Sequence, residues 1–272
     1  MTHLLVPIDE REASHRAVPV AGRLATRLDL PVQLFTRVES DAEAAEAKVE
    51  LDRIATSHLA ANDVTTATIH GEDPVEAIIA AAGETGIICM GTAASVRFHQ
   101  GHFGSVAEGV ARKLGRPLFL VGPEMDTHPG IETRKVVVPV DGSELSETGI
   151  EVGGRLAKKF DVPLWLVTVI SPKLEAQAQR ELGSAAVAME TNYVHNLARD
   201  IRRAHTIDAE YEVLHHDNPA HAIVEHAGDD GTVVMSTHGR SGLSRLVAGS
   251  VAIGVVAKSK RAVVVFRPAD NT

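Results

Sequence analysis

Residues 4–9 of the chain read LLVPID, and residues 136–141 read VVVPVD. The same offset relates the next apolar run, PVQLFT at 31–36, to PLWLVT at 163–168. Self-similarity that continues along the chain indicates two copies of one structural unit. At a larger offset, three more pairs follow: 73–78 with 218–223, 104–105 with 249–250, and 116–121 with 261–266.

Within each copy, apolar runs of strand length alternate with segments of helical pattern. This alternation predicts parallel strand pairing with right-handed crossovers. We therefore expect an α/β fold of two tandem flavodoxin- or Rossmann-like domains, each a five-stranded parallel sheet sandwiched by helices. A segment rich in proline and glycine, 122–130, separates the copies, so the expected domains are 1–125 and 131–272. The expected strands of the first copy are 3–8, 31–37, 64–69, 86–90 and 117–121.

The helical segments carry start and break signals. Ala13–Leu28 has alanines at helical spacing, and Pro19 predicts a kink or a helix start close by. Asp73–Glu76, which reads DPVE, is typical of a capping box at a helix start. The second copy carries an insertion within 171–209, and its helix-forming residues predict a lengthened helix over 174–203.

Composition narrows the class of protein. The chain has 272 residues, 44% of them hydrophobic and 23% charged, which is typical of a globular protein. The formal net charge of −9 argues against a general nucleic-acid or anionic-membrane binder. The N-terminus lacks a signal-peptide pattern, and apolar runs stay shorter than the roughly 18 residues of a membrane span. With the single cysteine, Cys89, expected in the core, these features predict a cytoplasmic protein.

Candidate ligand-binding residues follow the strands of the second copy. In parallel sheets, ligands lie at the carboxyl ends of the strands. Asp141 follows the first strand and Ser236–Gly239 follows the fourth, while Gly249 and Ser250 open a helix. A glycine-bearing loop before a helix N-terminus can receive a phosphate on free N–H groups. Each feature also has a structural interpretation, Asp141 as a helix cap and the glycines as a turn.

At these positions the chain resembles the universal stress protein family in its tandem two-domain form. The family signature is Gly-x2-Gly-x9-Gly-Ser/Thr after the fourth strand, with Asp at the end of the first strand. From Ser236 to Ser250 the second copy departs from the signature only at Ser236. From Gly91 to Ser105 the first copy departs from it at Ala94.

The resemblance implies an adenosine-nucleotide pocket in the second copy. Asp141 and the backbone before it would line adenine and ribose, and the loop after the fourth strand would hold the phosphates. The implied binding residues are Pro139, Val140, Asp141, Val169, Met235, Ser236, His238, Gly239, Arg240, Gly249, Ser250 and Val251.

The first copy is predicted to be degenerate as a nucleotide site. Ala94 stands where the family backbone approaches phosphate, and Arg37 replaces an apolar position beside adenine. Phe98 and Phe103 are bulky enough to fill the phosphate space, although Asp9 remains in place.

The sequence does not carry the signatures of common catalytic sites. It lacks a Gly-x4-Gly-Lys-Ser/Thr phosphate loop and a Gly-x-Ser-x-Gly elbow. No catalytic residue is predicted, and weak ATP hydrolysis is the most that we expect. Neither His99 and His102 nor the histidines at 215, 216 and 221 come with a complete ligand set, so no metal site is predicted.

We therefore expect a cytoplasmic stress-response protein that binds ATP in its C-terminal domain as a regulatory ligand. AMP and ADP are alternative ligands, and Mg²⁺ would accompany ATP. The rival hypotheses are a scaffold or interaction protein without a nucleotide, and a slow ATPase. The final strands, 117–121 and 262–266, are expected to pair within the chain, and a homodimer of two chains is left open.

Overall fold

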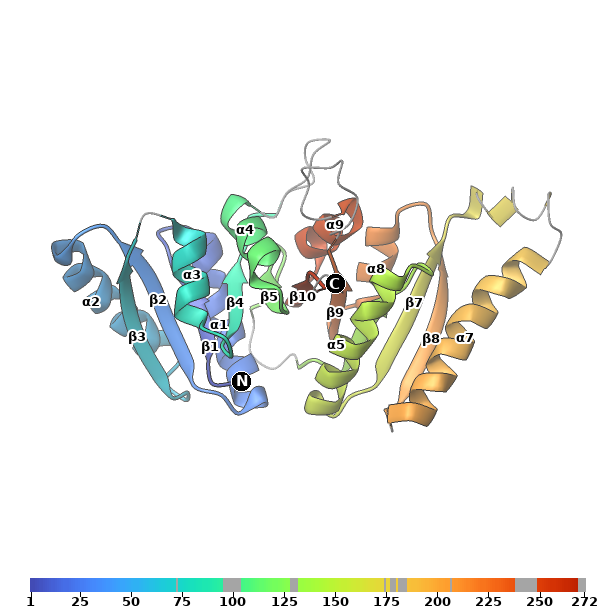
Figure 1. Cartoon of the computed structure of the whole chain (residues 1–272), viewed down its shortest axis with the longest axis horizontal. Coiled ribbons are helices and arrows are strands. Elements are labelled where there is room, and N and C mark those ends of the chain that lie inside the picture. The colour runs from blue at the N-terminus through green and yellow to red at the C-terminus, as the bar shows by residue number, and fades with distance from the viewer. Residues whose placement is uncertain are drawn as a thin grey trace.

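The strands of the N-terminal and C-terminal halves of the chain join in one ten-stranded sheet (Figure 1). The computed structural model describes the chain apart from residues 72, 95–103, 128–131, 174, 177–179, 181–184, 206, 238–248 and 269–272, and it describes the backbone alone at 185–190 and 204–205. The strands of the N-terminal half are β1 (Leu4–Pro7), β2 (Val32–Val38), β3 (Val64–His70), β4 (Ile87–Gly91) and β5 (Leu118–Val121). The strands of the C-terminal half are β6 (Lys135–Pro139), β7 (Leu164–Ile170), β8 (Ala209–His215), β9 (Gly231–Ser236) and β10 (Val263–Phe266).

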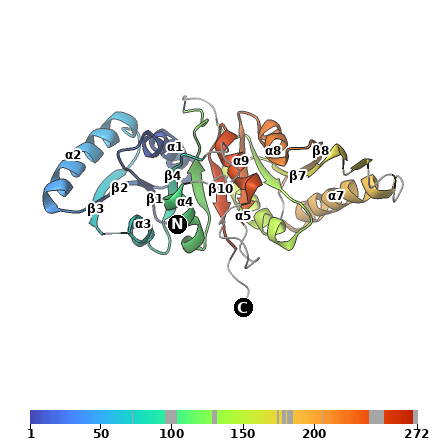
Figure 2. The ribbon, with the colours of Figure 1, turned by 90° about the horizontal axis from the view of Figure 1, so that it is seen from above.

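Helices connect the strands and cover both sides of the sheet in each half (Figure 2). The helices of the N-terminal half are α1 (Glu12–Leu28), α2 (Asp41–His58), α3 (Pro74–Ala82) and α4 (Ser105–Leu114). Those of the C-terminal half are α5 (Glu144–Phe160), α7 (Ala185–His205), α8 (Pro219–Ala227) and α9 (Ser250–Lys258). The predicted α/β fold is confirmed.

The strand order is β3-β2-β1-β4-β5-β10-β9-β6-β7-β8. Within each half the described pairs are parallel, whereas β5 and β10 pair antiparallel, with Val264 opposite Phe119. The predicted pairing of the final strands within the chain is therefore correct. The order reverses between β1 and β4, and again between β6 and β9, and such switch points create crevices for ligands at the carboxyl ends of the strands.

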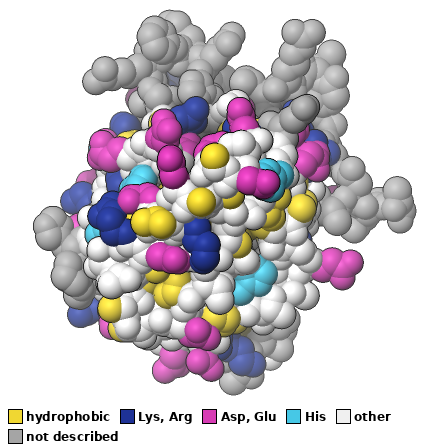
Figure 3. Space-filling view, turned by 90° about the vertical axis from the view of Figure 1, so that its left-hand side faces the viewer, with side chains coloured by type: hydrophobic (Ala, Val, Ile, Leu, Met, Phe, Trp, Pro, Cys, Tyr) yellow, Lys and Arg dark blue, Asp and Glu magenta, His cyan; other side chains and the backbone are white. Residues whose placement is uncertain are grey.

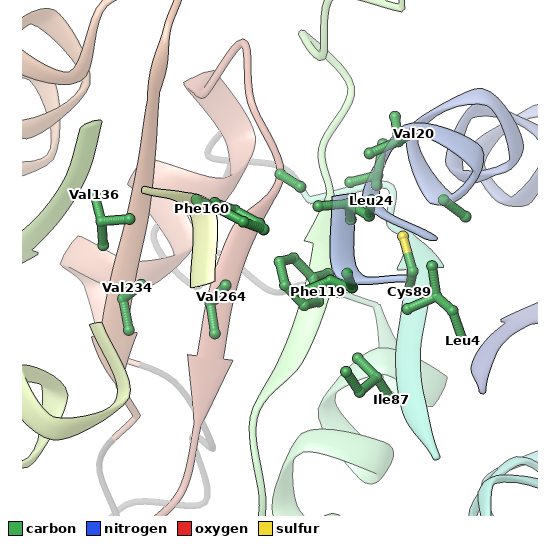
Figure 4. Packing of buried hydrophobic residues seen from close by; sticks show 14 of the residues in the cluster. Leu4, Val20, Leu24, Ile87, Cys89, Phe119, Val136, Phe160, Val234 and Val264 are labelled. Atoms are coloured by element: carbon green, nitrogen blue, oxygen red, sulfur yellow. The ribbon is translucent and has the colours of Figure 1, made fainter. Parts of the chain in front are cut away.

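The hydrophobic core continues across the seam between the halves. Alternate strand residues face opposite sides of a sheet, so Phe119 and Val264 lie in the core layer that α1, α2, α5 and α7 cover. Figure 4 shows Phe119 and Val264 facing each other from β5 and β10, with Leu24 of α1 and Phe160 of α5 above them. The two halves are thus held together by a shared apolar layer as well as by strand pairing.

Two local expectations differ in detail from the structure, and a third falls partly outside the described residues. Helix α1 continues through Pro19 to Leu28. The carboxylate of Asp73 caps α3 by accepting from the Val75 N–H at 2.8 Å, while Glu76 pairs with a lysine of α4 in place of completing a capping box. Of the helix expected over 174–203, the described residues 175–176, 180 and 185–203 are helical, and α7 is described from Ala185 to His205.

Other sequence expectations concern the core and the outer strands. Cys89 is fully buried, as expected, and burial raises the pKa of its thiol to about 12. Figure 3 looks onto the end that carries α2 and β3, where acidic, basic and apolar side chains are interspersed. Lys48 donates to Thr66 of this outer strand, and charge near a sheet edge disfavours pairing with other strands. Among the described residues, no helix combines the length and apolarity that a membrane span requires.

Candidate functional site

Asp141 lies in the loop that leads from β6 into α5, directly after Pro139 and the buried Val140. The carboxylate accepts hydrogen bonds from the Ser143 hydroxyl at 2.6 Å and the Ser143 N–H at 3.1 Å. Partial burial raises the pKa of Asp141, but hydrogen bonds from Ser143, Ser146 and nearby N–H groups outweigh it, so the pKa is lowered. Asp141 therefore presents an ionised, solvent-exposed acceptor near neutral pH.

Ser236 ends β9, the strand next to β6. The structure gives positive φ only to Asp29 and Asp161 among the described residues other than glycine, so Ser236 has an ordinary strand backbone. Its hydroxyl donates to the carbonyl oxygen of Leu145 in α5 at 2.9 Å. Serine is therefore accommodated where the family signature has its first glycine.

The first turn of α9 begins at Ser250, with Gly249 as the preceding N-cap residue. Gly249 has φ −64° and ψ 153°, and no described side chain caps the helix. The first N–H groups of a helix have no partner within the helix, and the helix dipole makes this end favourable for an anion. The start of α9 thus fits the phosphate role that the sequence indicated for Gly249 and Ser250.

The remaining predicted residues lie on the neighbouring elements. Val169 is half-buried near the end of β7, and Met235 is 9% exposed near the end of β9. Val251 is half-buried in the first turn of α9. Strand pairing of β7, β6 and β9 brings the ends of these strands to one edge of the sheet. His238, Gly239 and Arg240 lie outside the described residues.

The N-terminal half repeats the aspartate loop closely. The Asp9 N–H donates to Ser14 Oγ at 3.1 Å, as the Asp141 N–H does to Ser146 Oγ at the same distance. The Arg11 N–H donates to Asp9 Oδ1 at 3.0 Å and takes the place of the Ser143 N–H. A cavity of about 860 Å³ lies beside this loop.

The structure describes two of the four residues that suggested a degenerate nucleotide site in the N-terminal half, Ala94 and Arg37. Ala94 is 4% exposed, and Arg37 donates to the Gly71 carbonyl at 2.8 Å and to Glu39 at 3.2 Å. Phe98 and Phe103 lie outside the described residues. The predicted loss of nucleotide binding in this half stays a prediction.

Sequence reasoning did not single out the serines that fix the aspartate loop. Ser143 and Ser146 orient Asp141, and Tyr193 of α7 donates to Glu147 of α5 at 2.7 Å near the same loop. The serines were visible as hydroxyl residues just after an aspartate at a helix start. The tyrosine contact joins distant segments and leaves no local signal.

The histidine clusters do not form a metal site in the part of the chain that the structure describes. His216 and His221 stack at 4.9 Å between ring centroids, and His215 bonds Glu175 at 2.9 Å. No group of three or more candidate ligands occurs among the described residues, and His99 and His102 lie outside them.

Comparison with known proteins agrees with the repeat and the fold. The sequence model of the universal stress protein family matches residues 1–122 and 132–267. Universal stress protein Rv2005c of Mycobacterium tuberculosis is 26% identical over 196 residues, which cover 71% of this chain and 66% of that protein, just under two thirds of its length. Universal stress protein Slr1230 of Synechocystis is 26% identical over 188 residues, which cover 68% of this chain and 59% of that protein.

Solved structures show the same fold over the whole chain. The crystal structure of a universal stress protein from Archaeoglobus fulgidus has a TM-score of 0.66 at 20% identity and covers 98% of both chains. A universal stress protein structure from Pseudomonas aeruginosa has a TM-score of 0.61 at 15% identity, covering 99% of this chain and 94% of that one. With the family model matched twice along its length, this chain belongs to the universal stress protein family.

Proposed function

We propose that the protein is a stress-response protein that binds an adenine nucleotide in its C-terminal half as a regulatory ligand. One observation carries the proposal: the exposed, ionised Asp141 follows β6, and the start of α9, which no described side chain caps, follows the neighbouring strand β9. A carboxylate that only accepts suits ribose hydroxyls, and free helix N–H groups suit phosphates. The Asp141 carboxylate would bind the ribose of a nucleotide, and the start of α9 would bind its phosphates.

ATP is the proposed ligand, with AMP and ADP as alternatives and Mg²⁺ as a companion of ATP. In this proposal Val169 and Met235 pack on the nucleoside, and Ser250 and Val251 hold phosphates through backbone N–H groups. His238, Gly239 and Arg240 complete the phosphate site from outside the described residues. Binding would shift the equilibrium of association with partners.

Isothermal titration calorimetry of the full chain with ATP, ADP and AMP tests the proposal. Asp141→Asn removes the negative charge, and Gly249→Val places a side chain where phosphate would lie. The φ of −64° at Gly249 accepts valine without strain, so lost binding would not reflect a misfolded helix start. We expect each variant to weaken ATP binding by about tenfold or more.

Asp9→Asn is the matched control, because the same loop holds Asp9 in the N-terminal half. It should leave ATP affinity unchanged. The absence of binding at millimolar nucleotide, or equal losses in Asp9→Asn and Asp141→Asn, would contradict the proposal. An interaction scaffold without a nucleotide would then be favoured.

Further parts of the proposal need separate measurements. Slow ATP hydrolysis would appear as phosphate release that is lost in Gly249→Val. A homodimer would appear as twice the mass of 28.9 kDa in light scattering after gel filtration. A cytoplasmic location would appear on fractionation of cells that express the chain.

A further inference from the structure

The cavity in the N-terminal half has the size and floor of a ligand site. It measures about 860 Å³ and lies at the carboxyl ends of β1, β2 and β4. Ile8, Phe35 and Met90 form part of its floor, and each is less than one-tenth exposed. Small-molecule pockets in proteins typically measure roughly 300–1,000 Å³ and have mostly apolar linings. The floor therefore favours a ligand with a hydrocarbon part.

The wall that α2 contributes to this cavity is acidic. Glu43, Glu46 and Glu50 follow one another at about one helical turn, so they lie on one side of α2. Asp9 and Glu10 add two carboxylates from the loop after β1. Five carboxylates and two guanidinium groups thus line the cavity, which leaves an excess of negative charge.

The two guanidinium groups of the lining already have carboxylate partners, and His15 is a third basic side chain there. Arg11 lies 3.8 Å from Asp9, and Arg37 lies 3.2 Å from Glu39. Outside the lining, Arg53 pairs with Glu50. Among the described residues, three carboxylates of the lining have no ion-pair partner: Glu10, Glu43 and Glu46.

The other half provides an internal comparison, because α2 and α7 occupy equivalent places. Leu51 and Ile54 are the buried residues of α2, and Ala198 and Ile201 repeat their three-residue spacing in α7. A side chain at Gly22 would meet Leu59 just after α2, and one at Gly154, the matching position of α5, would meet Ile207 just after α7.

This alignment places uncharged residues opposite two of the three glutamates, whereas Glu43 corresponds to Glu190. Glu46 corresponds to Tyr193, and Glu50 corresponds to Leu197. Both Tyr193 and Leu197 pack against the core of the C-terminal half, and Tyr193 bonds Glu147. The acidic side chains of Glu46 and Glu50 are therefore specific to the N-terminal half, whereas that of Glu43 recurs in the repeat.

We propose that this cavity binds an organic cation, a molecule that carries ammonium groups on a hydrocarbon chain. Its methylene groups lie on the apolar floor, while its ammonium groups pair with Glu43 and Glu46. The same wall repels phosphate groups, whereas the start of α4, which lines the cavity at Gly104 and Ser105, attracts them. If the C-terminal half binds a nucleotide as proposed, the two halves bind ligands of opposite charge. The cation site itself does not depend on that nucleotide.

Titration calorimetry of the full chain with spermidine tests the proposal. We expect saturable binding of one spermidine, weakened by about tenfold in Glu43→Gln/Glu46→Gln. Both side chains are exposed and the substitutions preserve shape, so the fold should persist, which circular dichroism would verify. ATP affinity should be unchanged in this variant.

The control variant is Glu151→Gln/Glu225→Gln, which removes the same charge from exposed positions of the C-terminal half. It should bind spermidine as the wild type does. Equal weakening in the two double variants would show attraction to the overall charge of −9 and would overturn the proposal. So would the absence of saturable binding, or spermidine affinity that Glu43→Gln/Glu46→Gln leaves unchanged.

Discussion

Replacing Gly91 by serine is expected to destabilise the protein strongly, although serine holds the same position in the C-terminal half. A Cβ at Gly91 would lie 1.6 Å from the carbonyl oxygen of Ala13, in the first turn of α1. Carbon–oxygen contacts normally begin at about 3.3 Å, so β4 and α1 would have to separate by on the order of 1.7 Å. A change of rotamer cannot relieve the clash because both groups belong to the backbone.

The loss of stability in Gly91→Ser can be compared with the loss in Ser236→Gly, the reverse substitution in the other half. Overpacking a core costs about 1–3 kcal/mol, and more when the backbone must move, so Gly91→Ser should lower the free energy of unfolding by about 3 kcal/mol. Ser236→Gly is the reverse change in the other half. It removes one hydrogen bond to Leu145, worth about 0.5–1.5 kcal/mol, and adds backbone freedom worth about 0.5–1 kcal/mol. Its expected cost is therefore about 1–2 kcal/mol.

Urea denaturation followed by circular dichroism measures both costs. With a denaturant slope of about 1–3 kcal/mol per molar, a loss of 3 kcal/mol lowers the midpoint by about 1–3 M. If Gly91→Ser unfolded at the wild-type midpoint, the expected clash between its side chain and the Ala13 carbonyl oxygen would be refuted. It would also be refuted if Ser236→Gly proved the more damaging of the two.

Other predictions concern pH, the seam between the halves and the buried thiol. Burial lowers the pKa of His226 below its usual value of 6.5 in the folded state. Between the folded-state pKa and 6.5, the unfolded state therefore binds more protons than the folded state. The free energy of unfolding falls as the pH decreases through this window. Fluorescence of Trp165, whose ring lies 5.2 Å from that of His226, should report this in urea titrations, with a flatter pH profile in His226→Gln. Arg27 of α1 donates to the carbonyl oxygens of Thr133 at 2.6 Å and Phe160 at 2.5 Å, and its guanidinium carbon lies 4.4 Å from the centroid of the Phe160 ring. Arg27→Met should therefore lower the free energy of unfolding by about 2 kcal/mol in denaturant titrations, and Arg27→Lys should not restore both hydrogen bonds. The Cys89 thiol, with its pKa near 12 and no exposure, should react with a thiol reagent at pH 8 only after urea unfolds the chain.

The internal repeat made the fold predictable because the apolar strand runs and the helical segments of one copy recur in the other. The first expected strand, 3–8, is observed as Leu4–Pro7, and the last, 117–121, as Leu118–Val121. Parallel strands in such sheets are buried on both faces, so their apolar runs are nearly continuous and easy to recognise. The pairing of β5 with β10 could be expected because both would otherwise be bare edges.

The site was predictable only where one position dictates the local structure. Asp141 directly follows a strand end, and the structure places it in the loop before α5; the N-cap of that helix is Ser143, which donates to Asp141. The acidic wall of the N-terminal cavity could not be recognised in advance, because glutamates on an exposed helix usually mean a solvated face. Only the packing of α2 over the strand ends turns Glu43 and Glu46 toward a cavity.

The role of the first signature position can be argued from the two halves together. At Gly91 the backbone contacts Ala13, and at Ser236 the hydroxyl bonds Leu145, which is the equivalent residue of α5. In both halves the position therefore faces the first turn of the helix that follows the aspartate loop. This position sets the distance between the aspartate loop and the fourth strand of its half. In the N-terminal half the backbone of Gly91 contacts the helix because there is no side chain, and in the C-terminal half the Ser236 side chain reaches the helix through a hydrogen bond. Serine at 236 thus changes how the Asp141 side of the crevice is supported, and it need not remove a phosphate contact.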